Sequence, residues 1–280
     1  MLVTGASGFI GNHVVRGLLD RGVAVIAASR SLEKAKGMSW FPEVDFRELD
    51  MAASPEDPFV ALGSPDRMIH LAWAGLPQYL AEMHMEDNLP MNSAFLSSMV
   101  EGGLKHLLVA GTCFEYGMQE GELFEDVETQ PDNPYGRAKD LLRREMEALT
   151  MNLEMVFQWA RLFYMYGPGQ SQSSLFSQLQ AAIDNGDSVF NMSGGEQVRD
   201  FLSVESVAGL LVDVLFQDKV SGVINVCSGR SSTVRELVEE YLQKHGANIE
   251  LNLGHYPYPD YEPFRFWGNT AKLREAVKHG

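Results

Sequence analysis

Positive charge, cysteine and long hydrophobic runs are all scarce in this sequence. Its 280 residues include 22 Lys and Arg against 38 Asp and Glu, which gives a formal net charge of −16. A nucleic-acid partner is therefore not expected, because a phosphate backbone requires a basic surface. Two cysteines, Cys113 and Cys227, are too few for a disulfide framework and fit a reducing compartment, so we expect a cytoplasmic protein.

Membrane and metal signals are missing as well. No uninterrupted apolar stretch approaches the roughly 18 residues of a membrane-spanning helix. The chain begins in a strand-like run rather than in a basic and then apolar leader. The seven histidines show no metal-ligand spacing. We expect no membrane partner, no secretion signal and no metal site, and we interpret His70 as structural.

Short apolar runs alternate with helical patterns along the first 165 residues. Runs of strand length stand at 1–5, 23–29, 67–73, 106–111 and 155–163, and helical patterns at 13–22, 87–103 and 135–150. This alternation predicts an α/β protein with a Rossmann-like, doubly wound parallel sheet. A Gly/Pro/Ser-rich loop then changes the rhythm. We expect a dinucleotide-binding core over 1–165, with a return at about 196–218, and a smaller C-terminal substrate lobe in 166–280.

A glycine-rich turn joins the first strand to the first helix. The stretch TGASGFIG places Gly5, Gly8 and Gly11 at this junction. Glycine allows a tight turn and a close approach of backbone to a pyrophosphate, which the helix N-terminus then attracts. Glycines at such a junction can also be only a turn, and the spacing is not the commoner Gly-x-Gly-x-x-Gly. The context favours cofactor binding by Gly5, Ser7, Gly8, Phe9, Ile10 and Gly11.

A tyrosine and a lysine stand four residues apart at the start of a predicted helix. Tyr135 and Lys139 then share one helix face. A cation beside a phenol favours the phenolate and lowers the phenol pKa, so the tyrosine could exchange a proton with a substrate oxygen near neutral pH. A surface pair is the alternative. The strand that ends near Thr112 favours the catalytic interpretation, because ligands bind at the carboxyl edge of such sheets.

Together these stretches resemble the extended short-chain dehydrogenase/reductases, specifically the NAD(P)-dependent epimerase/dehydratase group that acts on nucleotide sugars. The resemblance covers nearly the whole chain and rests on TGASGFIG, HLAW at 70–73, Asn88, GTCFEYG at 111–117, PYGRAK at 134–139, RLFYMYGPGQ at 161–170, RDFLSVESVA at 199–208 and NVCSG at 225–229.

The resemblance implies a role for each matching residue. Tyr135 would be the acid/base, Thr112 would hydrogen-bond the reacting oxygen, and Lys139 would hold the nicotinamide ribose and tune Tyr135. Leu71 and Ala72 would lie against the cofactor. The substrate, a nucleotide-diphosphate sugar, would contact Thr112, Cys113, Tyr164, Arg199 and Arg265, the two arginines at its diphosphate.

The resemblance also implies a homodimer, because helices like those at 87–103 and 135–150 pair in this family. We expect these two helices to expose Phe95, Met99, Leu142 and Met146 for that purpose.

Departures from the family pattern narrow the reaction. Its 4,6-dehydratases carry an Asp-Glu pair directly after the threonine, and here Cys113 and Phe114 stand there, which argues against a dehydratase. Cys113 has no histidine near it in sequence and is expected to be a wall residue of the pocket rather than a nucleophile. Glu115 is a possible substrate contact. The absence of an asparagine near 163–165 indicates an altered sugar pocket.

The end of the second predicted strand bears on the cofactor. An acid usually stands there to accept hydrogen bonds from the ribose of NAD, and here Ser29 and Arg30 take its place. A hydroxyl and a guanidinium fit a 2′-phosphate, with Lys34 close downstream. We expect NADP(H) to be preferred, with NAD(H) possible if Arg30 instead stacks on the adenine.

These observations favour an NADPH-dependent reductase of a nucleotide-linked 4-keto sugar, in particular a 4-keto-6-deoxyhexose. A reductase consumes a hydride in each turnover, whereas an epimerase recycles bound NAD. An NAD-dependent nucleotide-sugar 4-epimerase is the alternative. A non-catalytic dinucleotide-sensing regulator is a third hypothesis, which the intact Thr112, Tyr135 and Lys139 set opposes.

Overall fold

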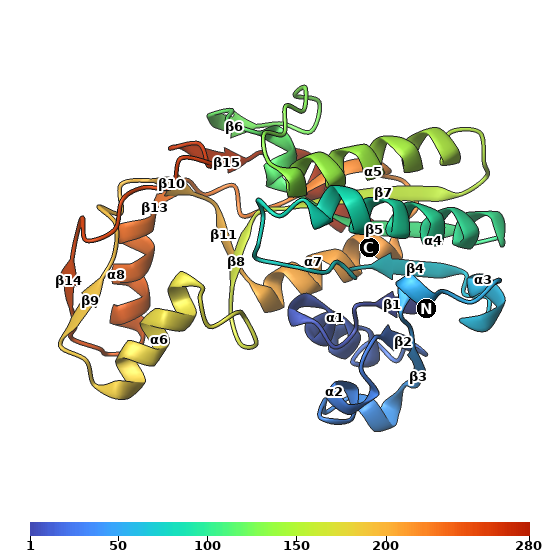
Figure 1. Ribbon diagram of the computed structural model, residues 1–280, viewed down its shortest axis with the longest axis horizontal. Coiled ribbons are helices and arrows are strands. Elements are labelled where there is room, and N and C mark those ends of the chain that lie inside the picture. The colour runs from blue at the N-terminus through green and yellow to red at the C-terminus, as the bar shows by residue number, and fades with distance from the viewer.

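A parallel sheet of seven strands forms the centre of the molecule. The computed structural model describes residues 1–280. The strand order is β12-β7-β5-β4-β1-β2-β3 (Figure 1), so the chain builds outward from β1 to β3 and then crosses back to β4 beside β1. The predicted doubly wound, Rossmann-like sheet is thereby confirmed. Its strands are β1 (Leu2–Thr4), β2 (Ile26–Ser29), β3 (Asp45–Glu48), β4 (Arg67–His70), β5 (His106–Thr112), β7 (Val156–Leu162) and β12 (Gly222–Val226).

Helices cover both faces of this sheet. One face packs against α1 (Phe9–Leu19), α7 (Val204–Phe216) and α9 (Ala271–Val277) around a buried cluster of 25 residues. The other packs against α4 (Leu89–Glu101) and α5 (Pro134–Thr150) around a cluster of 16. Two short helices, α2 (Leu32–Lys36) and α3 (Pro58–Ala61), complete the N-terminal half. Each helix turns its apolar stripe toward the strands, which is what burial of that stripe requires.

The structure corrects the prediction of which residues α4 and α5 expose. Phe95, Met99, Leu142 and Met146 are all buried in the cluster between these helices and the sheet. They form the packing stripe, because helical periodicity reports which residues share a face and not what covers that face. The solvent-facing side of the pair presents other residues, including Ala94 and the half-exposed Leu141.

The later chain builds a smaller lobe beside the sheet, at the left of Figure 1. Its own buried cluster joins α6 (Leu175–Asn185) to α8 (Val234–Lys244) through residues such as Leu179 and Val238. Short strand pairs connect it: β8 (Tyr164–Tyr166) with β11 (Phe201–Ser203), β9 (Val189–Asn191) with β14 (Glu250–Asn252), β10 (Val198–Arg199) with β13 (Ser232–Thr233), and β6 (Gly121–Leu123) with β15 (Phe266–Gly268). The later chain also returns to the core beyond residue 218, as β12 and α9.

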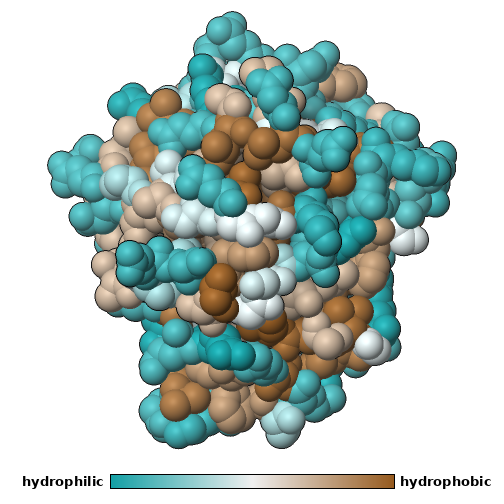
Figure 2. Space-filling view, turned by 90° about the vertical axis from the view of Figure 1, so that its right-hand side faces the viewer, coloured by the Kyte–Doolittle hydropathy of each residue, from teal (hydrophilic) through white to brown (hydrophobic).

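The far end of the molecule, which carries α3, shows apolar areas broken up by hydrophilic residues (Figure 2). None of the helices combines the length and the apolar composition that a membrane crossing requires.

Candidate active site

The glycine turn lies at the point where the sheet changes direction, between β1 and β4. Gly5 has φ +69°, in the left-handed region, and a Cβ there would lie 2.8 Å from the Ala72 backbone nitrogen. A Cβ on Gly11 would collide with the Gly5 carbonyl oxygen. Leu71 and Ala72 therefore press directly on the turn, with Ser7 inside it and with Phe9 and Ile10 opening α1. Only glycine leaves this cradle open for a pyrophosphate at a helix N-terminus.

The end of β2 carries an unpaired polar group. Ser29 is 8% exposed, and its hydroxyl oxygen has no hydrogen-bond partner within the chain. A buried hydroxyl without a hydrogen-bond partner is costly, so it indicates a bound ligand that supplies the missing hydrogen bond. Arg30, the next residue, is exposed, and Lys34 is exposed on the first turns of α2. The cradle and this hydroxyl together fit an adenine dinucleotide laid across the carboxyl ends of β1 and β2.

Thr112, Tyr135 and Lys139 come together at the end of β5. Asn133 caps α5 by accepting a hydrogen bond from the Gly136 backbone N–H at 2.8 Å, and this places Tyr135 in the first turn. Lys139 donates from Nζ to the Ala110 carbonyl oxygen at 2.9 Å. The Thr112 side chain lies close enough to the Tyr135 phenol to lower its pKa. The chain thus gathers the three candidate catalytic residues from β5 and α5.

Aromatic rings surround Tyr135 on several sides. The rings of Tyr79, His84 and Phe114 have centroids 5.6, 5.2 and 6.1 Å from that of Tyr135. The Trp73 ring lies 6.1 Å away edge-on and also faces the Lys139 ammonium at 3.9 Å. Sequence reasoning missed this wall. Trp73, directly after the β4 motif, and Phe114, in the turn after β5, were the available signals, because Tyr79 and His84 come from a stretch that no periodicity describes.

Burial sets the protonation of the two titratable groups. It raises the pKa of Tyr135 above its ordinary value, and the nearby Thr112 side chain opposes this only in part. Burial also lowers the pKa of Lys139 to about 7, against the attraction of the Glu115 carboxylate. The net lowering of the phenol pKa that the sequence predicts is therefore not what the structure shows, because burial outweighs any stabilisation of the phenolate by Lys139. Tyr135 is a protonated phenol at neutral pH and is suited to donate a proton.

The candidate substrate residues lie between the sheet edge and the small lobe. Cys113 is buried, and burial raises its thiol pKa, so it fits the expected wall residue rather than a nucleophile. The Tyr164 ring packs 5.3 Å from Phe201, and the Arg199 guanidinium lies 5.6 Å from the Tyr164 ring. Arg265 is exposed and faces the Trp267 ring at 5.9 Å. A backbone bridge between Val198 and Arg265 brings the two segments that carry these arginines side by side.

Arg199 is already paired in this structure. Its guanidinium donates to Glu262 Oε2 at 3.0 Å and to the Val198 and Phe264 carbonyl oxygens at 3.0 and 3.1 Å. Glu262 belongs to the Pro/Tyr-rich loop at 255–263, whose contact with Arg199 the sequence did not reveal. A diphosphate that bound Arg199 would have to displace this carboxylate.

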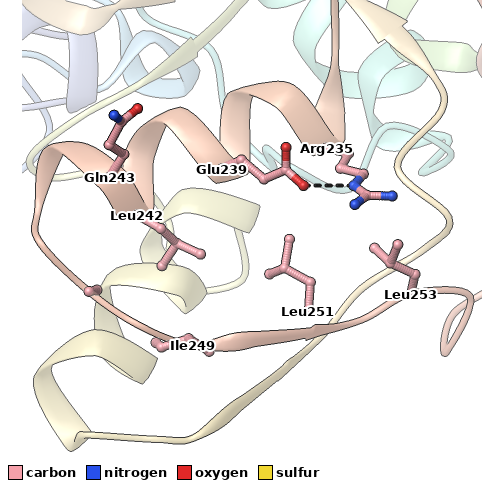
Figure 3. A pocket seen from close by; sticks show the side chains of 8 residues that line it. Arg235, Glu239, Leu242, Gln243, Ile249, Leu251 and Leu253 are labelled. Atoms are coloured by element: carbon pink, nitrogen blue, oxygen red, sulfur yellow. Dashed lines mark hydrogen bonds and ion pairs between the residues drawn. The ribbon is translucent and has the colours of Figure 1, made fainter.

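A separate hollow lies in the small lobe. It measures about 410 Å³ and is bounded by α8 and β14 in the small lobe (Figure 3). Leu242, Ile249 and Leu251 line it, and Arg235 and Glu239 form an ion pair of 2.7 Å at its rim. None of the candidate site residues borders it, so it is separate from the candidate active site.

The fold is that of a Rossmann-type, nicotinamide-dependent enzyme, and the candidate site places a buried tyrosine near the carboxyl edge of its sheet. Residues 1–227 match the NAD dependent epimerase/dehydratase family, and the chain belongs to that family. The resemblance drawn from the sequence, and with it the prediction of a nicotinamide-dependent enzyme, is confirmed.

Relatives of known activity and structure extend this comparison. The chain is 30% identical over 269 residues to dTDP-6-deoxy-L-talose 4-dehydrogenase (NAD(+)) of Aggregatibacter actinomycetemcomitans, covering 96% of this chain and 98% of the relative. MoeE5 in complex with UDP-glucuronic acid and NAD superposes with a TM-score of 0.82 at 25% identity, over 99% of this chain and 92% of that chain. UDP-N-acetylglucosamine 4-epimerase from Methanobrevibacter ruminantium M1 in complex with UDP-N-acetylmuramic acid reaches 0.86 at 23% identity, over 98% and 90%, and shows the shared fold.

Proposed function

We propose that the protein transfers a hydride between a nicotinamide cofactor and C4 of a nucleotide-linked 6-deoxyhexose, and that it works as a reductase of the 4-keto sugar. The observation that carries the proposal is the burial of the Tyr135 phenol beside Thr112, because burial raises the phenol pKa and so favours the protonated form. A protonated phenol is the form that reduction of a ketone requires, because the C4 oxygen gains a proton as the carbonyl becomes an alcohol.

The chain's residues divide the chemistry as follows. A nicotinamide cofactor held by these residues would supply the hydride for C4. Tyr135 gives its proton to the C4 oxygen, and the Thr112 hydroxyl hydrogen-bonds to that oxygen as negative charge develops on it. Lys139 holds the nicotinamide ribose, and its positive charge stabilises the phenolate that remains on Tyr135. The glycine cradle and Ser29 hold the rest of the dinucleotide.

The 6-deoxyhexose assignment rests on the aromatic wall and on the relative. Tyr79, Phe114 and Trp73 present apolar surface around Tyr135, which suits a methyl group at C6 better than a hydroxymethyl group. The Aggregatibacter relative is named for 4-dehydrogenation of dTDP-6-deoxy-L-talose. Oxidation at C4 and reduction of the 4-keto sugar are the two directions of one step. Arg199 and Arg265 would bind the diphosphate of the nucleotide.

The experiment that tests the function follows absorbance at the reduced-nicotinamide band. Purified protein is mixed with NADPH or NADH and with a dTDP-4-keto-6-deoxyhexose made in situ by a dehydratase. Stoichiometric loss of reduced cofactor supports the reductase. Absence of loss, together with NAD that remains bound through purification, would instead favour the 4-epimerase. Absence of any turnover, with Tyr135→Phe leaving cellular function unchanged, would favour a dinucleotide-sensing regulator.

We further propose that NADP(H) is preferred over NAD(H). The unpaired Ser29 hydroxyl and the exposed Arg30 support this, whereas the relative is named for NAD(+). Arg30→Ala should raise KM for NADPH about tenfold, the value of one charge pair of about 1.4 kcal/mol, and leave KM for NADH little changed. Lys36→Ala is the matched control, because Lys36 is an exposed cation at the end of α2, close to Arg30 in sequence, and it pairs with Glu33. An equal effect of Arg30→Ala on both cofactors would instead indicate adenine stacking.

The homodimer stays part of the proposal, with a different surface from the one expected. The outward sides of α4 and α5 would pair, with Leu141, 41% exposed, near the centre. Sedimentation should give twice the 31.1 kDa chain mass, and Leu141→Arg should give the monomer. Leu153→Arg, an exposed leucine just beyond α5, should leave the dimer intact. A wild-type monomer at micromolar concentration would contradict this surface.

A further inference from the structure

Glu115 is the one carboxylate buried directly beneath the candidate catalytic residues. It lies in the short 3-10 turn Cys113–Tyr116 that follows β5, and its side chain is fully buried. A Cβ on Gly111 would lie 2.6 Å from Glu115 Oε1, so the space around the carboxylate is filled by the chain itself. The substrate contact that the sequence left open for Glu115 is therefore excluded by its position, and another role must account for a buried charge there.

Three short hydrogen bonds hold this carboxylate. Oε1 accepts from the Thr112 backbone N–H and from Trp159 Nε1, both at 2.8 Å, and Oε2 accepts from Arg161 Nε at 2.7 Å. Trp159 and Arg161 are buried on β7, so the contacts fasten the turn to the neighbouring strand. Arg143 Nε of α5 lies 3.9 Å from Oε2. A charge with this many partners is a stable anchor.

The anchor acts on the catalytic hydroxyl through the backbone. Thr112 and Glu115 form a reciprocal capping box, in which the Thr112 hydroxyl oxygen caps the turn, with the Phe114 N–H 3.3 Å from it. A hydroxyl has one proton to give. Because the turn engages only a lone pair of the Thr112 oxygen, the Thr112 proton remains available for the substrate oxygen that Tyr135 protonates. If the Glu115 carboxylate were released, the Thr112 backbone would be less restrained and its hydroxyl would lose this orientation.

We propose that Glu115 is a positioning residue, which holds Thr112 in the orientation that the transfer at Tyr135 requires. This inference rests on the proposed function, because its test measures kcat of the proposed reaction. It goes beyond that function by assigning a positioning role to a residue that does not touch the substrate. Thr112 acts on charge that develops in the transition state, so loss of its orientation lowers kcat more than it raises KM.

The carboxylate also faces Lys139, and its negative charge raises the Lys139 pKa that burial lowers. The other titratable groups near this ammonium are His70 on β4 and His84 in the turn His84–Asn88, together with Tyr135 on the same helix. Both histidines have pKa values lowered by burial and are neutral at pH 7, His70 with a pKa of about 3. Glu115 is thus the anion that supports a charged Lys139.

Two variants separate these effects. Glu115→Asp keeps the charge opposite Arg161 but withdraws it from the Thr112 N–H, and should lower kcat about 10- to 100-fold with KM values within about threefold. Glu115→Gln should lower kcat similarly and also move the alkaline limb of the kcat–pH profile to lower pH. Glu147→Gln is the matched control, because Glu147 binds Arg143 at 2.6 Å and does not contact Thr112. If Glu115→Gln does not fold, Glu115→Asp carries the kcat test.

A double-mutant cycle decides the mechanism. Because Glu115 acts through Thr112, the Thr112→Ala/Glu115→Asp variant should be no slower than Thr112→Ala alone. If the kcat losses of the two single variants multiply in the double variant, the proposal is overturned. A folded Glu115→Asp variant with wild-type kcat would also overturn it. A wild-type enzyme without turnover would overturn the proposed function only. Hydrogen exchange of the amides at 112–116 then tests the anchor by itself, and exchange in Glu115→Asp no faster than in Glu147→Gln would overturn it.

Discussion

Lys139 is a lysine in an environment that disfavours its charge. It donates to the Ala110 carbonyl oxygen and faces the Trp73 ring, and burial lowers its pKa to about 7. The unfolded chain keeps this proton up to about pH 10.5, so between about 7 and 10.5 the unfolded state binds more protons than the folded state. The contribution of Lys139 to the free energy of unfolding therefore rises with pH over that window.

The Lys139 ammonium should also give the pH profile of kcat an alkaline limb. We expect kcat for reduction to fall as pH rises through about 7, because Lys139 loses the charge that stabilises the Tyr135 phenolate. Lys139→Arg keeps its charge at every working pH. Its kcat should be lower but should lack this limb between pH 6 and 9. Steady-state rates under saturating cofactor measure this, and an unchanged limb in Lys139→Arg would assign it to another group.

At the scale of elements, the turn between β1 and α1 is tightly packed. Gly11→Ala should lower the free energy of unfolding by about 1–3 kcal/mol and weaken cofactor binding, because its Cβ would meet the Gly5 carbonyl oxygen. Gly209 on α7 is the matched control, since a Cβ there meets nothing within 4 Å. Gly209→Ala should raise the free energy of unfolding by about 0.5–1 kcal/mol through helix propensity. Urea denaturation compares the two, and equal destabilisation would argue against a special role of the turn.

The accuracy of sequence interpretation also varied by element. The run at 106–111 became β5, and the pattern at 135–150 became α5, because apolar periodicity and the Asn133-Pro134 start are local signals. The prediction that α4 and α5 expose Phe95 and Leu142 for a dimer was wrong, because both are buried. Periodicity shows which residues share a helix face but not which element packs against that face. The aromatic wall around Tyr135 could not be predicted, because the loop that supplies Tyr79 is placed by tertiary packing.

At the scale of the molecule, the ion pair of Glu262 with Arg199 fastens the loop at 255–263 to β10. We expect Glu262→Gln to lower KM for the nucleotide sugar, because a carboxylate that competes with the diphosphate is removed. A competing pair worth about 1 kcal/mol corresponds to about fivefold in KM. Glu240→Gln, which breaks the exposed pair with Arg230, should leave KM unchanged. A higher KM in Glu262→Gln would instead mean that this carboxylate helps to bind the sugar.

The sequence by itself determined the alternation of strands and helices, the glycine cradle and the presence of Thr112, Tyr135 and Lys139, because each depends on residue types at short spacings. Only the tertiary structure decided their state. It buried Tyr135 so that its pKa rises, paired Arg199 with Glu262, and made Glu115 an anchor for Thr112 through β7. The reason is that burial and long-range pairing are set by which surfaces meet in the fold, and a local pattern contains no information about its distant partner.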